Sequence, residues 1–150
     1  MSLIRMSDLY AYIHTVLRED DVLRGLMGFT DSTTLEDMAL RIQKKRKPTG
    51  IVDGNFPIIS FYANPGVRDG ENHLVYMVTF DFDIYVQDGD EETAINIADR
   101  INAIFDDQYL GLKCVSNFKS EFMTMSEVET DQEDVFKFFT QILLNIGIEG

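Results

Sequence analysis

The sequence lacks several features that would place it in a specialised class of protein. It has one cysteine, Cys114, which excludes a framework of internal disulfides and fits a reducing compartment. No hydrophobic run reaches the roughly 18 residues that a membrane helix needs, and no signal peptide is expected at the start. Basic residues are few: 13 Lys and Arg stand against 26 Asp and Glu, and the formal net charge is −13. General nucleic-acid binding normally needs a basic surface, so this composition argues against it.

Motifs that carry catalysis are also missing. The glycines are scattered singly and form no phosphate-binding loop, and there is no C-x-x-C, H-E-x-x-H or G-x-S-x-G motif. His14 and His73 are predicted to be ordinary surface residues, and Cys114 has no histidine near it in the sequence to activate its thiol. The sequence therefore predicts a protein that is not an enzyme and uses no cofactor or metal ion.

The chain does contain enough apolar material for a folded core. Its 150 residues are 45% hydrophobic and 26% charged, which predicts one globular domain over 1–150. No repeat, low-complexity tract or linker divides it. Residues 1–3 and 149–150 are expected to be vector-derived and to add nothing to the fold.

Charge is distributed unevenly along the chain. Residues 1–70 hold nine basic and nine acidic side chains, whereas residues 71–150 hold four basic and seventeen acidic ones. The neutral half contains one compact basic run, which consists of Arg41, Lys44, Lys45, Arg46 and Lys47. This run is interpreted as a solvated helix end or as a docking patch for an acidic surface, with nucleic acid the last choice. Such an arrangement could let one copy attract another head to tail.

Four segments have the periodicity of amphipathic helices. They are expected from Ser7, at 20–28, from Thr33 or Thr34 to the stop at Pro48, and after a cap at Asp90. Elsewhere the apolar period changes to two, which predicts strands at 57–62, 74–87, 110–116, 121–127 and 135–148. The sequence thus predicts an α+β fold with a mostly antiparallel sheet and helices packed on one face.

Asp81 and Asp83 lie two residues apart on the longest predicted strand, so both carboxylates project from one face of the sheet. Such a pair could bind a divalent cation or act as acid and base on a sugar. It could also keep the outer face of a sheet wet, or line an assembly surface or channel where negative charge repels phosphate. The pattern leaves these three hypotheses open, with the wet sheet face favoured.

The predicted outer face is also partly apolar. Besides the two aspartates, its members on two strands are Val75, Met77, Tyr85, Phe139 and Leu143. A monomer has no reason to expose so many apolar side chains, whereas a subunit of an oligomer does. Either a subunit or partner interface or a further helix is expected to cover this face.

The order of these elements resembles the tail terminator proteins, also called tail-completion or tail-to-head joining proteins, of long-tailed bacteriophages and prophages. The resemblance rests on the helix that runs into 23–28 (LRGLMG), the proline-led strand at 56–62 (FPIISFY), the long strand at 78–87, the acidic start of the helix that follows, and the closing strand. It covers most of the chain as a pattern of elements.

The resemblance implies a structural role. Such proteins form a ring, usually a hexamer, that caps the tail tube and joins it to the head connector or neck, first in the bacterial cytoplasm and then in the virion. DNA would pass through without specific binding, and Asp81 and Asp83 would face the lumen. Independently of the resemblance, the polarity of residues 63–73 and 127–134 suggests ordering on assembly, which the sequence does not decide.

Three alternatives remain open at this stage. Another head–tail connector or neck protein could share the pattern of elements. A regulatory domain could bind a small ligand between the sheet and its helices. An enzyme could use Asp81 and Asp83 with a metal ion.

Overall fold

The computed structural model describes residues 5–51, 54–68, 70, 75–109 and 119–147. Its helices are α1 (Met6–Glu19), α2 (Asp21–Met27), α3 (Leu35–Arg41) and α4 (Glu91–Phe105). Its strands are β1 (Ile42–Gln43), β2 (Ile58–Ala63), β3 (Val67–Arg68), β4 (Val75–Gln87), β5 (Glu121–Val128) and β6 (Val135–Gly147). The predicted α+β fold, a mostly antiparallel sheet with helices on one face, is confirmed.

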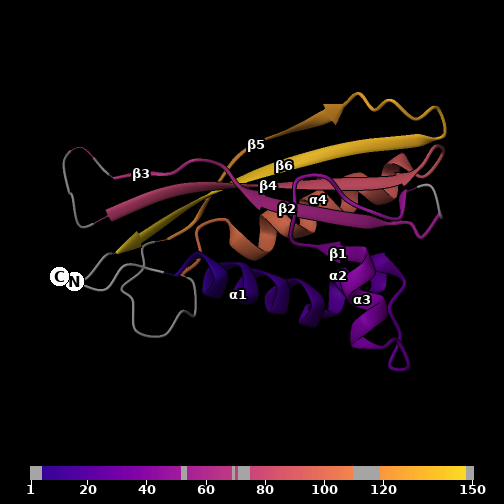
Figure 1. The fold of residues 1–150 in the computed structure, drawn as a ribbon, viewed down its shortest axis with the longest axis horizontal. Helices are drawn as coiled ribbons and strands as arrows, with labels where there is room; N and C mark the ends of the chain where they lie inside the picture. The colour runs from indigo at the N-terminus through magenta and orange to yellow at the C-terminus, as the bar shows by residue number, and fades with distance from the viewer. Residues whose placement is uncertain (1–4, 52–53, 69, 71–74, 110–118, 148–150) are drawn as a thin grey trace.

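The six strands form one sheet in the order β1-β2-β4-β6-β5, with β3 pairing to one end of β4. Among the described strands, only the β1–β2 pair is parallel. The two longest strands, β4 and β6, pair along their whole length, from Val75 opposite Gly147 to Gln87 opposite Val135. This central pair leaves β1 and β5 at opposite edges of the sheet (Figure 1).

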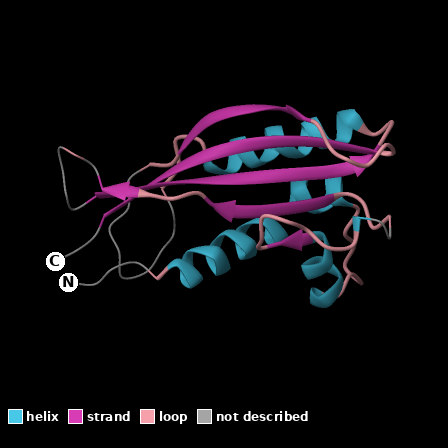
Figure 2. Cartoon of the chain, turned by 45° about the horizontal axis from the view of Figure 1, so that its top comes forward, coloured by secondary structure: helices cyan, strands magenta, loops and turns pink. Residues whose placement is uncertain are grey.

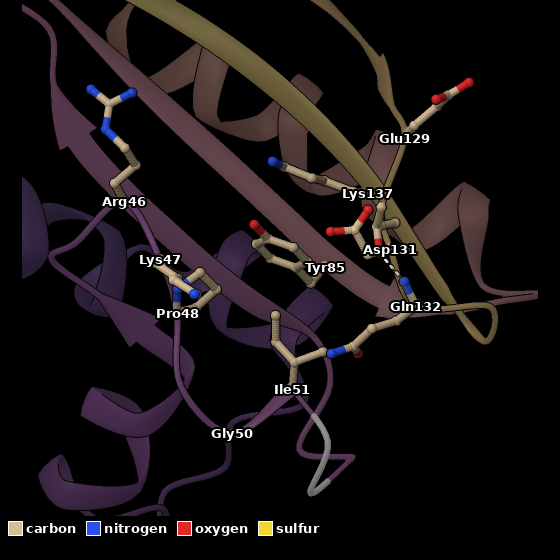
Figure 3. A pocket seen from close by; sticks show the side chains of 11 residues that line it. Arg46, Lys47, Pro48, Gly50, Ile51, Tyr85, Glu129, Asp131, Gln132 and Lys137 are labelled. Carbon is tan, nitrogen blue, oxygen red and sulfur yellow. Dashed lines mark hydrogen bonds between the residues drawn. The ribbon is translucent and has the colours of Figure 1, made fainter.

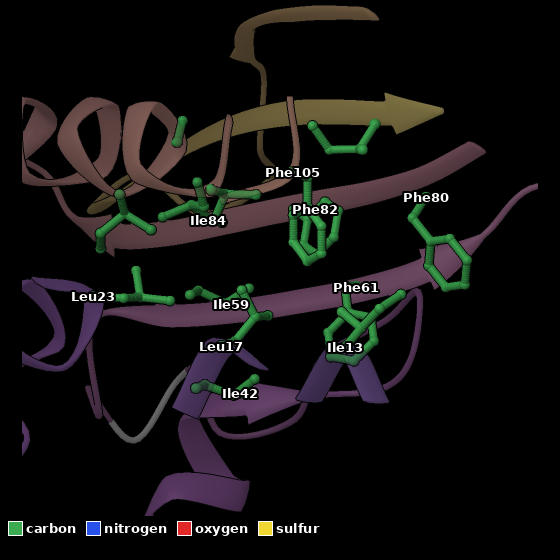
Figure 4. Close-up of a cluster of buried hydrophobic side chains, with 14 of the residues drawn as sticks. Ile13, Leu17, Leu23, Ile42, Ile59, Phe61, Phe80, Phe82, Ile84 and Phe105 are labelled. Atoms are coloured by element: carbon green, nitrogen blue, oxygen red, sulfur yellow. The ribbon is translucent and has the colours of Figure 1, made fainter. Parts of the chain in front are cut away.

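The alternation of β4 divides its side chains between the two faces. One set, including Phe80, Phe82 and Ile84, points toward the helices and joins the buried core (Figure 4). Phe82 stacks between Phe61 of β2 and Phe105 of α4, with ring centroids 5.7 Å apart on both sides. The space between sheet and helices, where the small-ligand interpretation expected a pocket, is thus filled by packed side chains.

The corner between α1 and α2 is held by Asp20. Its carboxylate accepts the backbone N–H of Leu23 at 2.9 Å and so caps α2. The same carboxylate accepts two bonds from Arg100 of α4, at 2.6 and 2.8 Å. The bond from Arg100 is the main cause that holds the pKa of Asp20 below its ordinary value. Gly28, at φ 77°, ends α2 in the left-handed conformation that glycine adopts without strain.

Replacing Asp20 with alanine is expected to lower the free energy of unfolding by about 1–2 kcal/mol at neutral pH, chiefly through the lost cap. Because the pKa of Asp20 is lowered in the folded state, its contribution is present above the ordinary carboxyl range and fades as the pH falls through the folded pKa. Urea unfolding at several pH values measures the difference from wild type. A difference that does not shrink in acid would contradict this role.

The third helix is shorter than predicted. It was expected to reach Pro48, but α3 ends at Arg41 and the chain becomes the short strand β1. Ile42 pairs with Ile59 of β2 and is buried in the core. The side chain of Gln43 bonds the carbonyl of Leu40 and both backbone groups of Thr49. These long-range contacts outweigh the helical spacing, so Arg41 ends α3 while the other four members of the basic run lie beyond the helix.

Smaller differences concern the ends of other elements. The first helix begins at Met6 rather than Ser7, and Asp90 precedes α4 without a capping bond from its side chain. The predicted strand at 110–116, with Cys114, and the second histidine, His73, lie outside the described residues. In the described part of the chain, no helix has the length and apolar character to cross a membrane.

Candidate functional site

Most of the candidate site residues predicted from the sequence lie on the face of the sheet opposite the helices. We call this face the outer face. The register places Ser60 of β2 opposite Asp83 of β4, and Tyr62 opposite Asp81. On the other side of β4, Asp83 lies opposite Phe139 of β6. Because paired residues point to the same face, these side chains form one surface. Figure 2 shows the strands of this sheet side by side. No described helix covers this surface, which removes one of the two explanations for its apolar members.

Asp83 is the most enclosed charged group of the outer face, at 3% exposed. Its carboxylate lies 3.6 Å from the ammonium of Lys137 and accepts a hydrogen bond from the hydroxyl of Tyr62. Burial raises the pKa of Asp83, and the neighbouring ammonium and hydroxyl oppose that effect. Burial, with the charges of Asp83 and Asp81, also raises the pKa of Tyr62. Tyr62 therefore stays a neutral donor at physiological pH.

Asp81 is half-buried and differs from Asp83 in its partners. One of its oxygens accepts hydrogen bonds from Asn64 at 3.0 Å and from Gln141 at 2.8 Å. Within the described residues, no group of three His, Cys, Asp or Glu side chains could hold a metal ion. Both aspartates accept hydrogen bonds or face a cation of the chain itself, from amide, ammonium and hydroxyl groups, so this arrangement suits a polar network better than a cation site.

The apolar members of the outer face are less exposed than predicted. Val75 and Tyr85 are buried, at 7% each, whereas Met77, Phe139 and Leu143 are half-buried. Tyr85 lies beneath the ammonium of Lys137, which is 5.4 Å from the centre of its ring. The apolar area open to a partner therefore consists mainly of the three half-buried side chains.

The basic segment, which we define as Lys44–Lys47, bends over one side of the outer face. The hydroxyl of Ser60 donates to the carbonyl of Lys45, and the guanidinium of Arg46 lies 4.3 Å from the centre of the Tyr62 ring. All four basic side chains are exposed, and the ion pairs found among the described residues include none of them. The segment thus keeps its positive charge available.

Arg41 belongs to the same run in the sequence but has a different role in the fold. Its guanidinium donates to the carbonyls of Met27, Phe56 and Pro57 and lies 5.0 Å from the centre of the Phe29 ring. Burial lowers its pKa. Arg41 therefore joins α2, α3 and the start of β2, and its donors are used within the chain.

A pocket of about 380 Å³ lies on the outer face between the basic segment and the acidic turn at 129–132 (Figure 3). Arg46 and Lys47 line one side, Glu129 and Asp131 the other, and Tyr85 with Lys137 the floor. No ion pair crosses the pocket among the described residues. Its walls carry both signs of charge, so the lining selects neither an anion nor a cation.

His14 was predicted to be a surface residue, and this prediction is wrong. Its side chain is buried, with Nε2 3.0 Å from the carbonyl of Ile42 and Nδ1 3.1 Å from the guanidinium of Arg18. Because Arg18 can only donate, Nδ1 accepts and Nε2 carries the proton. Burial lowers the pKa of His14, which agrees with a neutral ring. A weak signal was present in the sequence, since His14 lies three residues before the core residue Leu17 in the helix.

Comparison with known proteins finds a likeness in fold and none in sequence. No protein-family model matches the chain, and no curated protein is detectably similar in sequence. Among solved structures, the chain is similar to a chain of the "Virion of native gene transfer agent (GTA) particle", with a TM-score of 0.67. The two are 14% identical, and the match covers 97% of this chain and 99% of the other. At this identity the likeness shows a shared fold.

Proposed function

We propose that this chain is a structural, non-enzymatic protein of a phage-like virion. The observation that carries the proposal is the likeness to a chain of a gene transfer agent virion over nearly the full length of both chains. The match covers all but a few per cent of either chain, so the two proteins share a whole fold and not a fragment. A likeness of the whole fold supports a common role more strongly than a shared fragment does.

We propose further that the chain is a tail terminator. In this role it forms a ring of six copies that caps the tail tube and joins it to the head connector or neck protein. It would assemble in the bacterial cytoplasm and remain at the neck end of the tail in the virion. The resemblance in the order of elements supports this assignment, and the sheet face without a covering helix supports assembly.

In this ring we propose that the outer face turns toward the lumen, so that Asp81 and Asp83 lie on the lumen side. Lys137 compensates the charge of Asp83, whereas the exposed acids of the turn at 129–134 would repel passing DNA. Met77, Phe139 and Leu143 share this face, so in this orientation they would be available only to a part of the tail-tube or neck protein that enters the lumen. A ring reconstruction by electron microscopy with both aspartates between subunits or on the outside would overturn this orientation.

Light scattering on size-exclusion peaks over a range of concentrations tests the ring, followed by negative-stain imaging. Six copies of 17.2 kDa give about 103 kDa, and we expect a closed ring near that mass, alone or on added phage tail tubes. The tubes are included because a ring of this kind can close on its template. A chain that remains monomeric both alone and with tail tubes would contradict the proposed function.

A further inference from the structure

The free edge of β5 is unusually apolar for a surface. Residues 121–127 are all exposed, and they include Phe122, Met123 and Met125 at 36–47% exposed. Phe122 and Met125 lie on the helix side of the sheet, because they pair with Ile142 and Thr140 of β6, which face α4. Met125 touches Asn102 of α4, with its sulfur 3.4 Å from the side-chain amide. A patch of this kind on a sheet edge marks a site of association unless something covers it.

Acidic side chains surround this patch. Glu127, opposite Phe138, is exposed on the helix side with the patch, and Glu121, opposite Leu143, is exposed on the outer-face side of the same edge. Asp99 and Ile95 are exposed on α4 and lie one and two turns before Asn102, on the same side of the helix. Asp106, at the end of α4, accepts the N–H of Phe122 at 2.9 Å. The β5 edge is therefore an apolar centre within an acidic rim.

The backbone of this edge is also available. β5 pairs with β6 on one side, and no described strand pairs with its other side. Asp106 already occupies the N–H of Phe122, and a bulge follows between Phe122 and Thr124. The open part of the edge thus begins after the bulge and runs to Val128, with peptide groups that can bond to a partner.

The opposite edge of the sheet has the complementary character. Leu40 of α3 is 57% exposed and lines a second pocket, of about 350 Å³, together with Ala39, Lys44 and Lys45. The rest of the basic segment continues from this pocket. This surface, which we call the β1 edge, thus combines exposed apolar side chains, Ala39 and Leu40, with the positive charge of the basic segment.

We propose that neighbouring copies of the chain join head to tail, with the β5 edge of one copy docked on the β1 edge of the next. The inference rests on the proposed self-assembly and names the surfaces that carry it. The two edges match in apolar character and are opposite in charge, so a second copy fits the β5 edge better than an unrelated acidic or neutral protein. Because they lie on opposite sides of one sheet (Figure 1), each copy can give one contact and receive one, which is the requirement for a closed ring.

Two charge-reversal variants and their mixture test this contact. The variant with Lys44→Glu and Lys45→Glu has acidic side chains at both edges, and the variant with Glu121→Lys and Glu127→Lys has basic ones at both. Like charges then meet in every homotypic contact, and we expect each variant alone to lose the large species at concentrations where the wild type assembles. All four side chains are exposed, so circular dichroism should show both variants folded.

An equal mixture of the two variants is expected to assemble again. Each contact between unlike variants joins an acidic edge to a basic one, so the copies alternate around the ring. The restored rings would therefore contain an even number of subunits, with equal amounts of each variant by mass spectrometry. Unfolded chains could not be restored by mixing, so this result also separates loss of contact from loss of fold.

Matched controls change the net charge by the same amount away from both edges. Arg5→Glu with Arg68→Glu, and Asp8→Lys with Glu19→Lys, alter exposed residues and should leave assembly unchanged. Three results would overturn the contact. They are assembly of either edge variant alone at the wild-type level, failure of the mixture to assemble, and an equal loss of assembly in the control variants. A wild-type ring in the same experiment would then leave the proposed function standing, whereas absence of that ring would overturn both.

Discussion

Replacing Phe82 with alanine is expected to lower the free energy of unfolding by about 3–5 kcal/mol, the range for truncation of a buried aromatic side chain. Phe82 is 1% exposed and stacks on two rings, from β2 and α4, at 5.7 Å each. Its removal would leave a cavity where the sheet meets the helix layer. The β2, β4 and α4 backbones around it are fixed by strand pairing and helical hydrogen bonds, so the cavity can close only in part.

Equilibrium unfolding in urea, followed by circular dichroism, measures this loss. Tyr109→Ala provides the control because Tyr109 is 67% exposed, and its truncation should change the free energy of unfolding by no more than about 0.5 kcal/mol. A Phe82→Ala protein that loses less than about 1 kcal/mol, well under the range for such truncations, would show that the aromatic stack does not organise the core.

Replacing Lys137 with methionine is expected to have a comparable effect, about 3–5 kcal/mol at neutral pH, because it removes the counter-charge of a buried carboxylate. The Asp83 side chain is 5% exposed and would keep only the Tyr62 hydroxyl as a hydrogen-bond donor among the partners described above. Methionine keeps much of the length of the lysine stem, so most of the loss reflects the uncompensated charge rather than lost packing.

The loss should depend on pH in a direction fixed by the pKa of Asp83. Burial already raises that pKa in the wild type, and removing the Lys137 ammonium raises it further. A carboxyl group whose pKa is raised in the folded state does not lower the free energy of unfolding below its ordinary pKa, because it is protonated there in both states. The free energy of unfolding is lost as the pH rises through the folded pKa, where the buried group becomes charged. The difference between variant and wild type should therefore shrink as the pH falls through the raised folded pKa and be smallest below the ordinary pKa of a carboxyl group.

Two further variants complete this test. Adding Asp83→Asn to Lys137→Met removes the buried charge and should restore most of the lost stability. Lys119→Met breaks an ion pair of similar length, 3.1 Å to Asp107, in which both side chains are largely exposed, and should leave stability nearly unchanged. Equal losses for Lys119→Met and Lys137→Met, at every pH, would contradict the role given to the buried pair.

The strands and helices with a strong period were predictable from the sequence. In β4 and β6 the apolar residues alternate over 13 positions each, and in α1 and α4 they recur every three to four positions. Such patterns depend only on local geometry, so they determine which side chains are buried without knowledge of the partners. The same reasoning placed Asp81 and Asp83 together on the face away from the helices.

The partners of those side chains were not predictable in this way. Asp83 meets Lys137 only because β4 and β6 pair in one particular register, and the two residues are far apart in the chain. The end of α3 and the burial of His14 depend on the same point, Ile42, which pairs with β2 and whose carbonyl bonds the His14 ring. Periodicity cannot reveal such contacts, because each requires a segment distant in sequence.

The sequence by itself thus determined the class of fold, the face of each long element that is buried, and the acidic character of the second half. Tertiary structure decided that the outer face carries a compensated ion pair rather than two free carboxylates. It also brought the basic segment and the acidic, apolar β5 to opposite edges of one sheet. The physical reason is that composition and period are properties of neighbouring residues, whereas strand order and register follow from which packing of the whole chain has the lowest free energy.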